Sequence, residues 1–305
     1  MLPNARRDCV DIDCFWMGVL VYSHILSLYT PTTKNSVQIS SDKNNVFAVR
    51  ASGNVGSDVI DGLVRKGVET TAYVRNEKKA RELFKDELAT GLLSIVVGTY
   101  TSIDIYARAN EGHDRLFILV SGGVNKPVSM SKIKEIFGKI AYERRVRQIV
   151  DVSSYNVRID GIQCIIRHMH TTSEDKLLAL AETNSDERSL VILNISECAA
   201  AVLTEPVEKH DRSIYEAGAE VLSNEQRAKI FDKVLGTSIM YEQQTIEDFY
   251  KTNISSGMNH SFAYDLIKLA FNGEGKKATL QLAVILNPPL RTFEEWLQDN
   301  IQLFQ

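Results

Sequence analysis

Residues 46–74 read VFAVRASGNVGSDVIDGLVRKGVETTAYV, and this stretch decides the fold. Two short apolar runs, 46–50 and 70–74, flank the segment 54–65, whose aliphatic residues recur at helical spacing. Gly67 follows that segment, where a helix commonly ends in the left-handed conformation. The order strand, helix, strand predicts a βαβ unit with parallel strands.

The same alternation continues along the chain. The predicted strands are 46–50, 70–74, 93–97, 115–120, 148–152 and 190–193, and the predicted helices between them are 54–65, 77–83, 103–110, 129–142 and 172–182. The strands are continuous apolar runs, which is typical of a sheet covered by helices on both faces. We therefore predict an α/β fold, a doubly wound parallel sheet of the Rossmann type.

This pattern divides the chain into three parts. We predict an N-terminal extension and linker over 1–44, a Rossmann domain over 45–195, and a smaller, mainly helical substrate or partner region over 196–305 that packs on the Rossmann domain. The helices expected in the last region are 223–235, 245–251, 262–269 and 292–303.

Composition limits the classes of partner. The chain has 44% hydrophobic residues and a net charge of −4, which indicates a soluble globular protein and gives no reason to expect nucleic acid. Its four cysteines form no CxxC pair and its histidines no HExxH motif, so no metal site is predicted. We expect a cytoplasmic protein without a membrane partner.

The apolar run 15–29 leaves a secretory or membrane-anchor alternative. It is shorter than the roughly 20 residues that a spanning helix needs. Asp8, Asp11 and Asp13 precede it, where a signal peptide would carry positive charge.

The turn after the first strand reads RASGNVG, from Arg50 to Gly56. Gly53 lets the backbone approach a pyrophosphate, and Gly56 lets the following helix pack closely. The N-terminus of that helix offers amide groups and a partial positive charge to phosphates. Because the turn lies between a strand and a helix, it predicts a dinucleotide site.

Arg75 stands at the end of the second strand. A cofactor without a 2′-phosphate is usually held there by an acidic residue, whereas an arginine accommodates the 2′-phosphate. We therefore predict NADP(H) as the preferred cofactor, with NAD(H) as the alternative.

Several segments together resemble the NmrA-like family of atypical short-chain dehydrogenases. They are ASGNVG (51–56), YVRNEKKA (73–80), VVGTYTSID (96–104), the serine pair 153–154, HMHTTSE (168–174), NEQRAKIFDKVLGTSIMYE (224–242) and RTFEEWLQDN (291–300). The resemblance covers 45–305 and implies a Rossmann fold that binds NAD(P).

The resemblance also implies roles for individual residues. Those predicted to bind the cofactor are Arg50, Ser52, Gly53, Asn54 and Val55 around the pyrophosphate, Arg75 and Lys79 at the 2′-phosphate, Thr99 beside the adenine, and Ser121 and Ser153 beside the nicotinamide. The chain departs from the family pattern at Arg50, where the family has glycine. It departs again at Asn194, where the family more often has Arg-Pro or Arg-Asn after the aliphatic residues.

The usual catalytic pair of short-chain dehydrogenases is missing. A tyrosine and a lysine four residues later normally follow the fifth strand, but here Tyr155 is followed by Ile159. Hydride transfer to a quinone or a conjugated dye needs less, because the cofactor supplies the chemistry. Tyr155 and His170 are the candidate catalytic residues, and His170 with Glu174 matches the start of a helix in relatives that resemble triphenylmethane and quinone reductases.

Two functions fit these observations. The first is an NAD(P)H-dependent oxidoreductase of quinone-like or other conjugated acceptors, with a small-molecule substrate. The alternative is a non-catalytic redox sensor that binds NAD(P) and a regulatory protein; the missing tyrosine–lysine pair and the departures at Arg50 and Asn194 favour it. The resemblance at His170 and Glu174 favours the enzyme, which is our preferred interpretation. A third and weaker interpretation, motivated by Arg50, is a decayed paralogue that no longer binds the cofactor.

Overall fold

The computed structural model describes residues 44–120, 129–154, 157, 163–184, 188–193, 198–216, 220–271, 285 and 292–304. Ser121, Tyr155, Ile159, Asn194 and the apolar run 15–29 lie outside these ranges. The described chain falls into two compact units, divided after Glu216. We refer to them as the sheet unit and the C-terminal unit.

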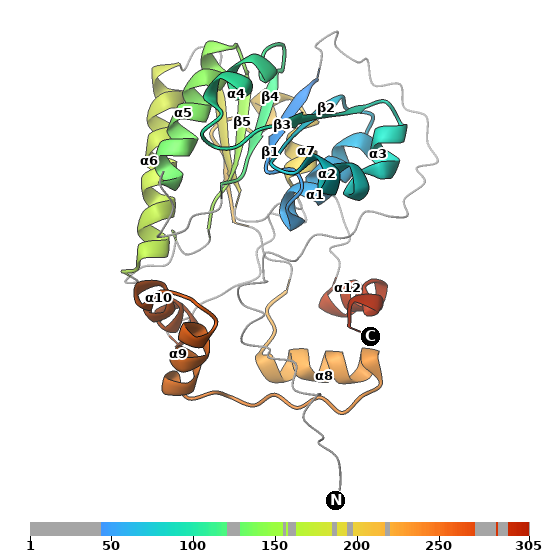
Figure 1. Cartoon of the computed structure of the whole chain (residues 1–305), viewed down its shortest axis with the longest axis vertical. Coiled ribbons are helices and arrows are strands. Elements are labelled where there is room, and N and C mark those ends of the chain that lie inside the picture. Colours follow the sequence, from blue (N-terminus) through green and yellow to red (C-terminus); the bar gives the residue numbers. More distant parts are fainter. Residues whose placement is uncertain are drawn as a thin grey trace, which may run out of the picture. The chain divides into compact units, whose positions relative to one another are not determined.

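The sheet unit is built on seven parallel strands (Figure 1). They are β1 (Val46–Val49), β2 (Thr70–Val74), β3 (Leu93–Val97), β4 (Arg115–Ile118), β5 (Gln148–Val152), β6 (Ser189–Leu193) and β7 (Ile214–Tyr215). Their order is β3-β2-β1-β4-β5-β6-β7, and every neighbouring pair is parallel. The predicted doubly wound Rossmann sheet is therefore confirmed.

Helices cover both faces of this sheet (Figure 1). The helices α4 (Ile103–Ala109), α5 (Met130–Glu143) and α6 (Ile165–Thr183) lie on one face, and α1 (Asn54–Arg65), α2 (Glu77–Leu83), α3 (Lys85–Ala89) and α7 (Ala199–Val202) on the other. This two-sided cover explains why the five inner strands, β2, β1, β4, β5 and β6, are buried along their whole length.

The sheet extends beyond the six predicted strands. After β6 the chain forms α7, a short 3₁₀ helix (Val207–Lys209) and then β7, which pairs Ile214 and Tyr215 with Ile192 and Leu193. A strand of two residues is too short to leave an alternating or a continuous apolar pattern, so the sequence carried no signal for it.

One helix begins earlier than predicted. The apolar pattern suggested a start at residue 172, but α6 begins at Ile165, and this prediction was wrong. Cys164 is its N-cap, with the sulfur accepting a hydrogen bond from the Arg167 backbone N–H at 3.3 Å. Cysteine is not a typical cap residue, so the start could not be recognised. His170 therefore lies in the second turn, inside the helix.

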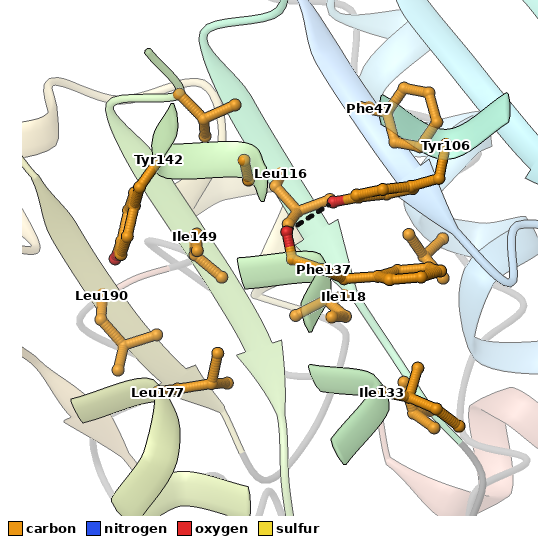
Figure 2. Close-up of a cluster of buried hydrophobic side chains, with 14 of the residues drawn as sticks. Phe47, Tyr106, Leu116, Ile118, Ile133, Phe137, Tyr142, Ile149, Leu177 and Leu190 are labelled. Carbon is orange, nitrogen blue, oxygen red and sulfur yellow. Dashed lines mark hydrogen bonds between the residues drawn. The ribbon is translucent and has the colours of Figure 1, made fainter. Parts of the chain in front are cut away.

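The core beneath α4, α5 and α6 is built around an aromatic stack (Figure 2). The rings of Tyr106 and Phe137 lie 3.8 Å apart between centroids and are nearly parallel. The Tyr106 hydroxyl donates a hydrogen bond to the Phe137 carbonyl at 3.0 Å, so burial leaves it satisfied. Phe47 of β1 meets the Tyr106 ring edge-on and joins the stack to the sheet.

The described part of the C-terminal unit is helical. It contains α8 (Asn224–Leu235), α9 (Ile246–Ser255), α10 (His260–Phe271), α12 (Phe293–Asp299) and a final 3₁₀ turn (Ile301–Leu303). Capping boxes begin α8 at Ser223 and α12 at Thr292. Phe293 packs edge-on against Phe231, which holds α12 on α8. Among the described residues, no helix is both long and apolar enough to cross a membrane.

The stack predicts a large effect of one core substitution. Replacing fully buried Phe137 with alanine should lower the free energy of unfolding by about 3–5 kcal/mol, because the stack is lost and a cavity remains. Urea denaturation followed by circular dichroism measures this change. Leu83→Ala, at a helix residue that is 42% exposed, is the control and should change stability by less than about 0.5 kcal/mol. Equal losses in the two variants would contradict this account of the core.

Candidate functional site

The connections of the sheet reverse direction beside β1. From β1 the chain winds outward through β2 to β3, then crosses back to β4 on the other side of β1. In open parallel sheets, ligands bind at the carboxyl ends of the strands at such a switch point. The turn that begins at Arg50 follows β1 at this place.

The turn keeps the backbone shape of a phosphate-binding loop although it starts with arginine. Arg50 has a φ of 61°, in the left-handed region that glycine adopts without steric strain. The Gly53 N–H donates to the Arg50 carbonyl at 3.1 Å and closes the turn. The Arg50 side chain lies beside Gly53, since a Cβ at Gly53 would stand 3.2 Å from the arginine Nε. The Arg50 side chain is thus directed along the loop.

Gly56 is where the helix and the turn come closest. A Cβ at this position would lie 2.4 Å from the Arg50 carbonyl oxygen and 2.8 Å from that of Ala51. Both neighbours are backbone atoms, so they cannot turn aside as a flexible side chain would. Only glycine fits here, and its absent side chain allows α1 to begin directly against the turn.

The first turn of α1 carries no acidic side chain, and its N-cap, Gly53, has no side chain that could accept a hydrogen bond. The helix has 12 residues, enough for its dipole and its amide groups to favour an anion at this end. The glycine cradle and this helix end fit the pyrophosphate of a dinucleotide.

Basic side chains stand at the neighbouring strand end. Arg75 directly follows β2 and is exposed, and no hydrogen bond or ion pair joins it to another residue within the described ranges. Asn76 caps α2 by accepting a hydrogen bond from the Lys79 backbone N–H at 3.0 Å. This places Lys79 in the first turn of α2, close behind Arg75, with its side chain exposed.

The end of β3 is tied to β2 by one tyrosine. The Tyr73 hydroxyl donates to the Thr99 carbonyl at 2.8 Å, and the same ring lies where a side chain on Gly98 would be. The Thr99 hydroxyl forms hydrogen bonds with those of Thr101 and Ser102 at 2.9 and 3.0 Å. This turn is exposed, so Thr99 borders the edge at which Arg75 stands.

A second group of polar residues lies at the carboxyl end of β5. Ser153 and Glu174 are buried and hydrogen-bonded to each other, with the serine hydroxyl donating to the carboxylate. The Ser153 Oγ lies 3.4 Å from Nδ1 of His170. Burial, with the charge of Lys134 adding to it, lowers the pKa of His170 to about 3, so the imidazole is neutral at physiological pH.

Two charged residues at this end of the sheet were missed by the sequence analysis. Lys134 of α5 and Asp151 of β5 are fully buried, with Nζ 2.6 Å from Oδ1. A lysine on the apolar side of a helix and an aspartate inside the run QIVDV were the available signals, because polar residues at core positions need partners.

The described candidates therefore form two groups at the same edge of the sheet. The loop residues 50–55, Arg75, Lys79 and Thr99 follow β1, β2 and β3, and Ser153 with His170 lies at β5. The predicted residues Ser121 and Tyr155 lie outside the described ranges. In the part of the chain that the structure describes, no group of three or more histidine, cysteine, aspartate or glutamate residues could hold a metal ion.

Comparison with known proteins agrees with this geometry. Residues 51–185 match the NAD(P)H-binding family model. No protein of curated function matches the sequence significantly.

Solved structures share the fold at low sequence identity. Triphenylmethane reductase from Citrobacter sp. is 18% identical, with a TM-score of 0.66 over 85% of this chain and 99% of that one. An NADPH-dependent quinone oxidoreductase from Escherichia coli is 18% identical, with a TM-score of 0.64 over 85% and 100%. An NmrA double mutant is 12% identical, with a TM-score of 0.64 over 86% and 97%.

The fold and the matched model together define the class. Residues 51–185 form an NAD(P)H-binding domain of the Rossmann type. The fold is shared with triphenylmethane reductase and with NmrA, so the predicted resemblance to NmrA-like proteins is confirmed for the fold.

The close approach at Gly56 makes a specific prediction. Gly56→Ala should abolish NADPH binding measured by calorimetry, because the new methyl group would push α1 away from the turn. Gly67→Ala at the other end of α1 is the control. Gly67 has a φ of 77° with open space around it, so its substitution should cost about 1–2 kcal/mol of stability and leave NADPH affinity unchanged. Normal NADPH binding by Gly56→Ala would refute the proposed role of this contact.

Proposed function

We propose that this protein is an NADP(H)-dependent oxidoreductase that reduces quinone-like or other conjugated acceptors. The observation that carries the proposal is the glycine-capped start of α1 at the switch point, with exposed Arg75 at the next strand end. The fold shared with an NADPH-dependent quinone oxidoreductase and with a triphenylmethane reductase supports the reaction class.

In this proposal the pyrophosphate lies against Ser52, Gly53, Asn54 and Val55. The positive end of α1 offsets its charge, and the absence of a side chain at Gly53 leaves room for the phosphate oxygens. Arg50 adds a guanidinium beside the same loop, as its position along Gly53 suggests.

The adenosine half extends toward β2 and β3. Arg75 binds the 2′-phosphate with its planar fork of N–H donors, Lys79 adds a second positive charge, and Thr99 borders the adenine. NAD(H) lacks this phosphate, so the two cationic side chains favour NADP(H) and leave NAD(H) as a weaker ligand.

The nicotinamide half points toward β4 and β5, with Ser121 and Ser153 beside it. The bound cofactor supplies the hydride, so the chain needs only to orient the acceptor and supply a proton. Tyr155 and His170 are the candidates for that task. A conjugated acceptor suits the site because the tyrosine–lysine pair that carbonyl reduction uses in ordinary short-chain dehydrogenases is replaced by Tyr155 and Ile159.

The role of Arg75 predicts a change in cofactor preference. Arg75→Ala should weaken NADPH binding about 10–100-fold, since charge-assisted hydrogen bonds contribute about 1.5–3 kcal/mol, and should leave NADH binding unchanged. Calorimetric titration with both nucleotides measures the two affinities.

Arg81→Ala is the matched control for that experiment. Arg81 lies on the same helix as Lys79 and pairs with Glu77 at 2.8 Å, so its loss should not alter the affinity for either nucleotide. Equal weakening of NADPH and NADH by Arg75→Ala would contradict the assignment of Arg75 to the 2′-phosphate.

The alternative is a redox sensor that binds NAD(P) without turning it over and signals to a protein. The arginine at a φ of 61° in the phosphate loop and Ile159 in place of the usual lysine favour it. NADPH oxidation with a panel of benzoquinones, naphthoquinones and triphenylmethane dyes separates the two functions. Turnover with any member supports the enzyme; tight NADPH binding with no turnover supports the sensor.

A further inference from the structure

Five polar side chains meet at the carboxyl end of β5. They come from α5, β5, the residue after β5, and α6, and they are Lys134, Asp151, Ser153, His170 and Glu174. All except His170 are at least 95% buried, and His170 is partly buried. A buried polar cluster is costly unless its members satisfy one another, so its arrangement calls for an explanation.

The two carboxyl groups of this cluster have different partners. Lys134 is the buried cation, and it binds both oxygens of Asp151, at 2.6 and 2.9 Å, and the Val152 carbonyl at 3.1 Å. Glu174 is a second buried carboxyl, close enough to raise the pKa of Asp151 further, although burial is the larger cause and brings that pKa to about 6. Lys134 therefore binds Asp151, and Glu174 is the carboxyl that binds Ser153.

Two hydrogen bonds connect Glu174, Ser153 and His170 and give a path for a proton. Ser153 has one hydroxyl hydrogen, and it donates this hydrogen to Glu174. The Ser153 oxygen can then only accept from His170, which places the imidazole hydrogen on Nδ1 and leaves Nε2 with a lone pair. Nε2 has no hydrogen-bond partner among the residues that the structure describes.

We infer that Glu174, Ser153 and His170 form a proton relay that delivers a proton from the buried cluster to an oxygen of the acceptor at Nε2 of His170. This inference rests on the proposed oxidoreductase function. It assigns His170 as the residue that contacts the acceptor, Ser153 as the link and Glu174 as the proton store. The acceptor class is then one whose oxygen gains a proton on reduction, a quinone or another conjugated carbonyl compound.

The relay balances atoms and charge. The loaded state of the relay has the reverse of the hydrogen-bond order in the structure: Glu174 carries the proton to be delivered and donates to Ser153, Ser153 donates to Nδ1, and the imidazole hydrogen is on Nε2. Reduction adds a hydride from NADPH to the acceptor, and the Nε2 proton moves to the acceptor oxygen. The Ser153 proton moves to Nδ1 and the Glu174 proton to Ser153, so Glu174 ends as a carboxylate and the relay has the hydrogen-bond order seen in the structure. A solvent proton that binds Nε2 then reverses these shifts and returns the proton to Glu174.

The relay never requires a charged imidazole. Burial and the nearby Lys134 ammonium group disfavour the imidazolium form. A simple acid–base role for His170 would need that form, whereas the relay only exchanges one neutral tautomer for the other. Lys134, which binds Asp151, therefore disfavours a charged His170, so the protons at Nδ1 and Nε2 must move together.

The first test reads the tautomer of His170 without turnover. Nitrogen-15 spectra of histidine-labelled protein, assigned with His170→Gln, should show a neutral His170 with its hydrogen on Nδ1, as the hydrogen-bond order in the structure requires. In Ser153→Ala the tautomer distribution should return toward that of a free neutral imidazole. Identical His170 spectra in the two proteins, or an imidazolium at neutral pH, would overturn the relay.

The second test measures turnover of NADPH with naphthoquinone. Ser153→Ala and Glu174→Gln should each lower kcat by about 10²–10⁴-fold, the usual contribution of positioned proton transfer, while Glu174→Gln keeps its NADPH affinity. For the unmodified protein, a plot of kcat against the fraction of D₂O in the solvent should be curved, because several protons move together. For Ser153→Ala the same plot should be linear.

Ser173→Ala is the matched control. Ser173 is buried beside Glu174 on α6, but its hydroxyl donates to the Met169 carbonyl at 2.6 Å and lies outside the relay, so kcat and the isotope effect should not change. Full activity of Glu174→Gln with NADPH binding intact would refute the relay and leave the oxidoreductase function standing. No NADPH oxidation by the unmodified protein with any acceptor would refute the proposed function, and the tautomer measurement would still decide the hydrogen-bond order.

Discussion

The contact between Gly56 and the backbone of the preceding turn is the constraint on which the candidate site depends. Because α1 starts within van der Waals reach of two carbonyl groups, its first amides lie at the carboxyl end of β1, where the sheet reverses direction. The loop, the helix end and the strand ends then share one edge. A side chain at residue 56 would move α1 away from the turn. The sheet would remain, but the first amides of α1 would no longer lie where a phosphate could bind at the switch point.

Much of this architecture could be predicted because the responsible signals are local. Parallel strands that are covered on both faces appear in the sequence as short apolar runs. The end of α1 is marked by Gly67, which has the expected left-handed conformation with a φ of 77°. The phosphate loop was recognisable for the same reason, since strand, glycines and helix follow one another directly. At Arg50 the expected glycine is absent, but the residue still has the left-handed conformation. The surrounding pattern of strand, glycines and helix was therefore sufficient to identify the turn.

What could not be predicted depends on contacts between distant segments. β7 exists because two residues find the edge of β6, and nothing within those two residues indicates it. The Lys134–Asp151 pair joins a helix and a strand 17 positions apart in the chain, and each residue alone looks like an interruption of an apolar pattern. α6 starts early because Cys164 caps it. His170 therefore lies in the second turn of the helix and not before its first residue, as the sequence had predicted.

The two edges of the sheet differ in a way that bears on assembly. At one edge, β3 presents five residues, and Val97 is 42% exposed; at the other, β7 consists of two residues. A foreign strand that paired with β7 would gain too short a ladder to be held, so this edge is protected by its brevity. The β3 edge offers a longer template, and solubility of the sheet unit should therefore respond to changes in charge there rather than at β7.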